Sequence, residues 1–345
     1  MGRDSVKIGI WLEQTTVEAG DVLKGRVNLS IRNQCQFAQG VRLLVVGEEV
    51  TCIEREREQH QLDGAPKFDR ASSSIVHLDL PLHSFPSGGV SPGKYSYPII
   101  WPLPPNLPSS TMLDKVTRKG CGSSCEIRYK ITAYLDKDGT TPYSLELSHS
   151  VSLRVFGAST KQRADPMVCP LEEFNIRDCC KSFGNIMLGW DTDTTVATPQ
   201  STIRVGIVGK NNSIAHVDCL KVCWDETVTL LANGRTSKYT RTLAKAKISP
   251  TTDLWRPLLN LPSQNKLRRL RCVGHSELIQ NRCTALLRLP KDARDSYQGN
   301  LISVRHSLSV AAVTSDWCTA SPVSSILVQF QHRMGSNECS IRNTQ

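Results

Sequence analysis

The chain has 345 residues, with 42 Lys and Arg against 32 Asp and Glu and a formal net charge of +10. This length exceeds what one small core supports, so it predicts two domains of about 150 residues each. No apolar run approaches the ~18 residues of a membrane span, and residues 1–5 do not begin a signal peptide, which argues against a membrane-spanning or secreted protein.

The first half is predicted to consist of strands. Apolar and more polar residues alternate at 6–12 and 27–31, then at 76–80 and 95–99, and again at 151–155. The clearest run places apolar side chains from Ile127 to Leu135 on one face, while the opposite face carries Glu126, Arg128, Lys130 and Thr132. Such alternation is typical of strands with one buried and one solvated face, as in an antiparallel sandwich. We expect this first domain to span residues 1–157.

The segment 158–181 is polar, contains Pro166 and Pro170, and is predicted to be a linker. Alternation returns at 203–207, 228–230, 302–310 and 326–330, which predicts a second all-β domain over residues 182–330. His306 lies on an otherwise apolar face and is expected to be a core histidine and not a metal ligand. Residues 331–345 are predicted to be a short flexible tail.

The positive charge is concentrated in one stretch. Residues 1–157 have a balance of +1 and residues 158–345 a balance of +9, while residues 235–271 alone hold ten basic side chains and one acid, Asp253. A local patch of this kind indicates a charged partner, with a solvated face as the alternative.

No catalytic motif is present in the sequence. Residues 206–210 (GIVGK) lack the spacing of a phosphate-binding loop and are followed by Asn211. Glu48 and Glu49 are adjacent, so on a strand they would point to opposite faces, and both are expected to be solvated. The thirteen cysteines are irregularly spaced and are expected to be reduced thiols without a metal. We therefore expect no enzymatic activity and no cofactor, but a binding or adaptor protein.

Three segments of the first half resemble a known family. Residues 93–98 read GKYSYP, residues 101–110 read WPLPPNLPSS and residues 125–133 read CEIRYKITA. Prolines cannot donate to a ladder, so one strand ends and the chain crosses in an extended form before the next begins. This order is similar to the signature of the arrestin N-domain, especially in the α-arrestins (arrestin-domain-containing proteins), and residues 17–27 (VEAGDVLKGRV) resemble its opening hairpin. The signature residues, with an expected structural role, are Gly20, Gly25, Gly93, Tyr95, Pro98, Leu103, Pro104, Leu107, Pro108, Ser109 and Tyr129.

The second half resembles the arrestin C-domain more loosely. Residues 179–184 (CCKSFG) are similar to its Cys-rich beginning, and residues 302–310 (ISVRHSLSV) to its closing strands. The resemblance implies two tandem immunoglobulin-like antiparallel β-sandwiches. It also implies a cytoplasmic adaptor, located peripherally at the plasma membrane or endosomes, that binds the cytoplasmic tails or loops of membrane proteins and couples them to endocytosis, endosomal sorting or ubiquitination.

Many α-arrestins recruit a ubiquitin ligase through P-P-x-Y motifs. The single Pro-Pro pair of this sequence, Pro104-Pro105, is followed by Asn106 and Leu107, so recruitment through such a motif is not predicted. The sequence neither predicts nor excludes a ubiquitin ligase as a partner.

The resemblance also gives the basic stretch a partner. Basic C-domain residues of several arrestins bind phosphoinositide headgroups, so phosphoinositides, another anionic membrane surface or a phosphorylated receptor tail are the expected ligands. The expected contact residues are Lys238, Arg241, Lys245, Lys266, Arg268 and Arg269. Each cation near an anionic membrane contributes roughly 1 kcal/mol.

Two other functions fit the same fold. One is a structural coat subunit, like the arrestin-fold subunit of retromer. The other is nucleic-acid binding, which the sequence pI of 9.0 suggests. Bases need aromatic stacking platforms, and Tyr239 is the only aromatic residue within 235–254, so no nucleic-acid partner is predicted.

Overall fold

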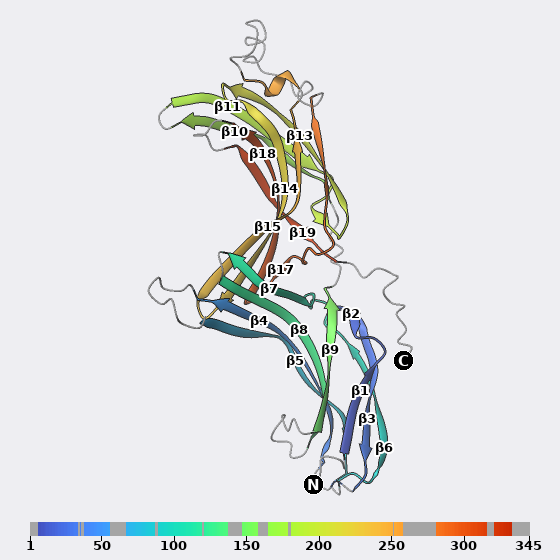
Figure 1. The fold of residues 1–345 in the computed structure, drawn as a ribbon. Helices are drawn as coiled ribbons and strands as arrows, with labels where there is room; N and C mark the ends of the chain where they lie inside the picture. Colours follow the sequence, from blue (N-terminus) through green and yellow to red (C-terminus); the bar gives the residue numbers. More distant parts are fainter. Residues whose placement is uncertain are drawn as a thin grey trace.

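A computed structural model of the chain describes residues 6–33, 35, 38–55, 67–86, 89–118, 121–136, 147–157, 165–178, 181–250, 252–257, 281–315 and 321–332. The described residues form two β-sandwiches, one from each half of the chain (Figure 1). The prediction of an all-β protein with two sandwiches is confirmed.

The first sandwich consists of a small and a large sheet. The small sheet has the order β1–β3–β6, and the large sheet has the order β2–β9–β8–β4–β5, with β7 also paired to β8. All of these pairings are antiparallel except the short parallel contact between β2 and β9. The strands are β1 (Val6–Leu12), β2 (Thr16–Glu18), β3 (Val22–Ile31), β4 (Gly40–Glu54), β5 (Phe68–Ser84), β6 (Gly93–Pro102), β7 (Thr111–Arg118), β8 (Cys121–Asp136) and β9 (Ser148–Phe156).

The second sandwich repeats this plan. One sheet has the order β10–β11–β13–β16, and the other has the order β12–β19–β18–β14–β15, with β17 also paired to β18. The β12–β19 pairing is parallel. The elements are β10 (Met167–Asp178), β11 (Lys181–Thr192), β12 (Val196–Ala197), β13 (Thr202–Ser213), β14 (Val217–Ala232), β15 (Arg235–Ile248), the 3₁₀ turn η2 (Asp253–Trp255), β16 (Cys283–Arg288), β17 (Tyr297–Gln298), β18 (Ile302–Thr314) and β19 (Val323–Phe330).

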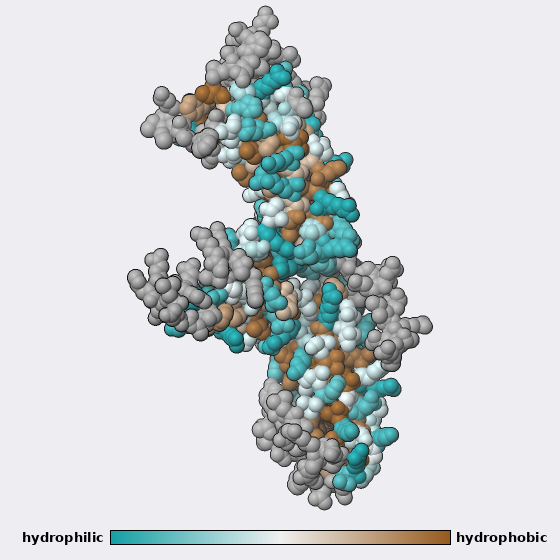
Figure 2. Space-filling view, viewed as in Figure 1, coloured by the Kyte–Doolittle hydropathy of each residue, from teal (hydrophilic) through white to brown (hydrophobic). Residues whose placement is uncertain are grey.

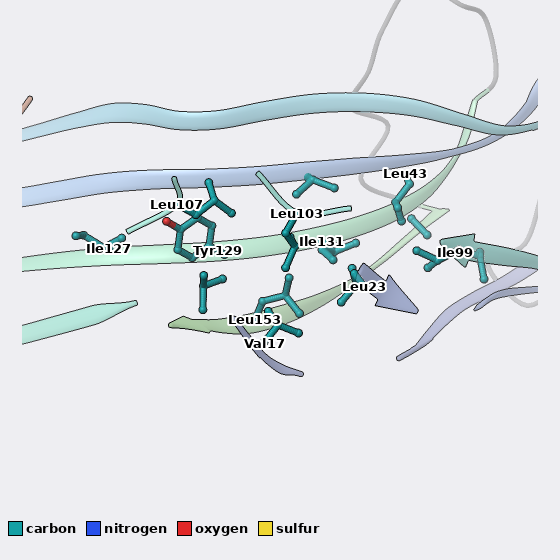
Figure 3. Close-up of a cluster of buried hydrophobic side chains, with 14 of the residues drawn as sticks. Val17, Leu23, Leu43, Ile99, Leu103, Leu107, Ile127, Tyr129, Ile131 and Leu153 are labelled. Atoms are coloured by element: carbon teal, nitrogen blue, oxygen red, sulfur yellow. The ribbon is translucent and has the colours of Figure 1, made fainter. Parts of the chain in front are cut away.

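The core of the first sandwich follows the alternation seen in the sequence. On β8, Ile127, Tyr129 and Ile131 are buried, while the residues between them face outward. Because successive side chains of a strand point to opposite faces, each sheet contributes one apolar layer. Figure 3 shows side chains from both sheets meeting in this layer, among them Leu23 and Leu153.

The junction between the sandwiches has an apolar part. The strands β14 and β18 continue beyond the second sandwich, and Val228, Leu230 and Ile302 belong to the hydrophobic cluster of the first sandwich. A core that includes side chains from both halves opposes free movement of one half against the other.

The expected linker is partly structured. Residues 167–178, placed in the linker by the sequence, form β10, which pairs with β11, so the expectation of a linker throughout 158–181 was wrong for this segment. The alternation of β10 is obscured by register shifts on either side of its Glu172–Asn175 segment. Residues 158–164, 179–180 and 333–345 lie outside the described residues. None of the helices in the described residues is long and apolar enough to cross a membrane.

Candidate functional site

The basic stretch forms part of an edge strand. Lys238, Lys245 and Lys247 are all exposed on β15, which among the described strands is hydrogen-bonded to β14 alone. Lys247 lies opposite Lys221 of β14. The charges therefore line the outward face at the margin of the second sandwich.

A β-bulge in β15 brings Lys238 and Lys245 to the same face of the strand. Lys238 and Lys245 are seven residues apart, an odd spacing that places two side chains of a regular strand on opposite faces. The register shifts at Leu243, because Trp224 pairs with Ala244 but Asp225 pairs with Thr242. The extra residue reverses the alternation, so both lysines emerge on one side.

Arg241 is directed away from that face. Its Nε donates to Glu226 Oε1 at 2.8 Å and its Nη1 to Asp292 Oδ2 at 3.1 Å. The structure thus gives Arg241 a partner on the inner side of the sheet, whereas Lys238 and Lys245 stay exposed. Lys266, Arg268 and Arg269, which the sequence grouped with them, lie outside the described residues.

Glu226 is the centre of a buried polar cluster that sequence reasoning missed. It is fully buried and also accepts hydrogen bonds from the backbone N–H of Arg294 at 2.9 Å and from its Nη1 at 2.5 Å. His306 Nε2 lies 3.7 Å from Glu226 Oε2, and His306 Nδ1 lies 2.9 Å from Ser296 Oγ. Burial by itself would raise the pKa of Glu226, but the facing His306, Arg241 and Arg294 outweigh it and lower the pKa to about 2.

The prediction that His306 is a core histidine is confirmed, since its side chain is buried and bonded to Ser296. Glu226 carries no sequence signal beyond its position on an alternating strand. Its partners Arg241 and Arg294 are 53 residues apart in the chain, so only the fold brings them together.

A second buried carboxylate, Glu49, joins the two sandwiches. Its Oε1 accepts a hydrogen bond from the Tyr297 hydroxyl, and its Oε2 accepts one from the Leu301 N–H at 2.6 Å. The expectation that Glu49 is solvated was wrong, because its strand runs into the junction and the second sandwich covers that face. Glu48 points to the other face, where it pairs with Arg128.

Further polar contacts cross the junction. Thr51 Oγ1 donates to Leu231 O at 2.7 Å, and Arg235 Nε lies 3.1 Å from Asp69 Oδ2. Ser109 Oγ donates to Asp295, a residue of the segment that follows β16. The junction therefore combines an apolar contact with several specific hydrogen bonds.

Three of the signature residues have distinctive local geometry. Gly20 has a positive φ of 91° in the turn before β3, a conformation that other residues rarely adopt. A Cβ at Gly25 would overlap the carbonyl oxygen of Trp11 on the neighbouring strand. The Tyr129 hydroxyl donates to Pro108 O at 2.8 Å, which holds the proline crossing against β8.

The other signature residues lie in the proline crossing and on β6. Leu103 and Leu107 are buried, and Pro104 lies between them in the crossing. The Gly157 N–H donates to Ser109 Oγ at 2.6 Å. The remaining three, Gly93, Tyr95 and Pro98, lie on β6.

A hollow of about 820 Å³ lies on the outward face of the large sheet of the first sandwich. Strands β4, β5, β7, β8 and β9 contribute to it. Its lining mixes apolar side chains such as Val46 and Met112 with the charged Arg128, Lys130 and Arg154. This combination suits an extended peptide better than a small apolar ligand.

The described cysteines do not form a metal site. The seven whose side chains are described are free thiols, and no group of three His, Cys, Asp or Glu within the described ranges could hold an ion. Burial raises the pKa of the Cys125 thiol to about 12, which keeps it protonated at neutral pH.

Comparison with protein families identifies both halves of the chain. Residues 7–155 match the model of the arrestin (or S-antigen) N-terminal domain, and residues 182–337 match the model of the arrestin (or S-antigen) C-terminal domain. A search of curated proteins gave no match. The two domain matches follow in the same order as the two sandwiches. The chain therefore belongs to the arrestin family and is an arrestin-like adaptor.

Proposed function

We propose that this protein is a cytoplasmic adaptor of the α-arrestin type. In this proposal it binds the cytoplasmic tails or loops of membrane proteins and couples them to endocytosis, endosomal sorting or ubiquitination, while it is held peripherally at the plasma membrane or endosomes. The observation that carries the proposal is the presence of both arrestin domains, in order, over most of the chain. No catalytic role and no nucleic-acid partner are proposed.

The hollow on the first sandwich supports the peptide-binding part of the proposal. Arg128 is neutralised by Glu48, with Nη2 2.7 Å from Oε1, and by Glu126 at 3.6 Å. Lys130 and Arg154 line the same hollow and make no ion pair with a described residue. A cytoplasmic segment with acidic or phosphorylated side chains would complement these two cations.

The lysines of β15 support the membrane part. Lys238, Lys245 and Lys247 face outward together, and Lys221 lies beside Lys247. Each cation near an anionic bilayer contributes roughly 1 kcal/mol, so four of them give a weak contact that a bound membrane protein would reinforce.

Proximity labelling in cells tests the adaptor function. A biotin ligase fused to the full chain should label integral membrane proteins and endocytic or endosomal proteins above a cytoplasmic ligase control. A Lys130→Glu/Arg154→Glu variant should lose cargo labelling if the hollow binds it, whereas a Glu172→Lys/Glu173→Lys variant, altered on β10 away from the hollow, should not. Labelling that matches the cytoplasmic control would refute the proposal.

Vesicle co-sedimentation tests the contact through β15. We expect a Lys238→Ala/Lys245→Ala/Lys247→Ala variant to pellet less with phosphoinositide vesicles than the wild type. The matched control, Arg70→Ala/Arg177→Ala/Arg288→Ala, removes three exposed cations elsewhere. Equal pelleting of the two variants would show that β15 is not the contact.

The hydrogen bonds and the apolar contact between the two sandwiches would also suit a rigid coat subunit of the retromer type. Size-exclusion chromatography of the native complex distinguishes the two functions. A constitutive complex of fixed stoichiometry favours the coat subunit, and transient association with membrane proteins favours the adaptor.

A further inference from the structure

The small sheet β1–β3–β6 carries a second cationic surface, separate from β15 (Figure 1). Its inner face packs on the core, and its outer face is exposed. The outer face holds four cations: Lys7, Lys24, Arg26 and Lys94. None of the three strands contains an Asp or Glu residue. Within the described residues, none of these four cations makes an ion pair.

The strand register fixes how these residues are arranged. Lys7, Ser30 and Lys94 lie in one row across the sheet. Two residues further along, Gly9, Asn28 and Ser96 form the next row. Their short side chains leave a shallow hollow between the two lysines, large enough for an anionic group.

Large apolar side chains occupy the other end of the same face. Trp11 is 48% exposed and Ile100 is 74% exposed. The guanidinium of Arg26 lies 4.9 Å from the centre of the Trp11 ring. Lys24 of β3 lies opposite Ile100 of β6 in the strand register. Exposed Trp among cations is typical of surfaces at the membrane–water interface, where the ring lies at headgroup level and the cations reach phosphates. Figure 2 shows hydrophobic and hydrophilic residues side by side over the lower sandwich.

Three kinds of partner could cover this face, and the charges distinguish them. A second copy of the chain would set four cations against four cations, which is repulsive. An acidic peptide would complement the cations but would leave Trp11 and Ile100 without an apolar partner. An anionic bilayer satisfies both, because it presents phosphates directly above an apolar layer.

We propose that the outer face of β1–β3–β6 docks on an anionic phospholipid bilayer. Lys7, Lys24, Arg26 and Lys94 contact headgroup phosphates, and Trp11 and Ile100 enter the interfacial layer. This surface lies on the first sandwich, so it is independent of the β15 contact proposed above, and either can fail without the other.

The test uses the purified full chain and vesicles of phosphatidylcholine with or without 30% phosphatidylserine. We expect binding only to the vesicles with phosphatidylserine, and weaker binding at higher salt. A Lys24→Ala/Lys94→Ala variant should lower the partition coefficient roughly 25-fold, because each cation accounts for about a fivefold change. A Lys238→Ala/Lys245→Ala variant reports the other surface under the same conditions and should keep the contact of the small sheet.

Tryptophan fluorescence adds a readout at the face itself. Trp11 emission should shift to the blue on vesicles with phosphatidylserine, and lipids brominated near the headgroup should quench it. A Trp11→Phe variant, which keeps an aromatic ring on an exposed position, should abolish both signals. Circular dichroism and the unfolding midpoint of each variant confirm that the fold is kept.

Two results would overturn the proposal. The first is binding that does not depend on phosphatidylserine or that the Lys24→Ala/Lys94→Ala variant retains in full. The second is binding of polyglutamate with the same dependence on these lysines, together with no Trp11 shift on vesicles, which would make the face a site for acidic peptides.

Discussion

Replacing Glu226 with glutamine should destabilise the second sandwich. Glu226 is fully buried and accepts hydrogen bonds from Arg241 and Arg294, so the amide leaves two cations without their carboxylate. Removing one partner of a buried ion pair lowers the free energy of unfolding by about 3–5 kcal/mol. We expect a loss near the lower end of this range, because the Arg241 side chain is a quarter exposed. The lowered pKa gives a similar figure, since a fall from 4.5 to about 2 corresponds to about 3 kcal/mol.

The effect should depend on pH in a defined direction. The folded pKa of Glu226 is below its ordinary value, so its contribution is present above pH 4.5 and is lost as the pH falls toward about 2. Denaturant unfolding at pH 7 should show the loss of about 3 kcal/mol, and thermal unfolding a midpoint roughly 6–12 °C lower. The difference between wild type and Glu226→Gln should shrink when both are measured near pH 3.

The matched control is Glu48→Gln. Glu48 also lies on a strand and pairs with an arginine, with Arg128 Nη2 at 2.7 Å, but its partner is half exposed. An exposed pair contributes less than about 1 kcal/mol. The reasoning is refuted if Glu226→Gln costs no more than Glu48→Gln, or if its cost is the same at pH 7 and pH 3.

Two further predictions concern the junction. Gly299→Ala should lower the free energy of unfolding in denaturant by about 1–3 kcal/mol, because the added Cβ would overlap the Glu49 carboxylate. Gly9→Ala, with open space around its Cβ, should change the free energy of unfolding by less than about 0.5 kcal/mol; equal effects of the two substitutions would contradict the close approach at Gly299. The hydrogen bond to Asp295 raises the pKa of His332, so about 1 kcal/mol of stability should be present below pH 6.5 and disappear as the pH rises through the raised pKa. Thermal unfolding at pH 6 and pH 9 should show this loss in the wild type and not in His332→Gln.

The fold class could be predicted from the alternation of apolar and polar residues. Alternating residues such as Ile127, Tyr129 and Ile131 require one buried and one solvated face, which is typical of an antiparallel sheet that packs on a core. The proline crossing around Pro104 and the turn at Gly20 then identify the family, because local backbone geometry is encoded in local sequence. The core histidine His306 was predicted for the same reason.

The grouping of the charged residues could not be predicted in this way, because it depends on strand register and on contacts between distant segments. The bulge at Leu243 sends Lys238 and Lys245 to one face and Arg241 to the other, and a one-residue shift of register leaves no clear mark in the alternation. Glu49 was expected on the surface and is buried, because residues about 250 positions later cover it. Charge composition counts the basic residues, but strand register and the packing of the two sandwiches decide which of them remain available to a partner.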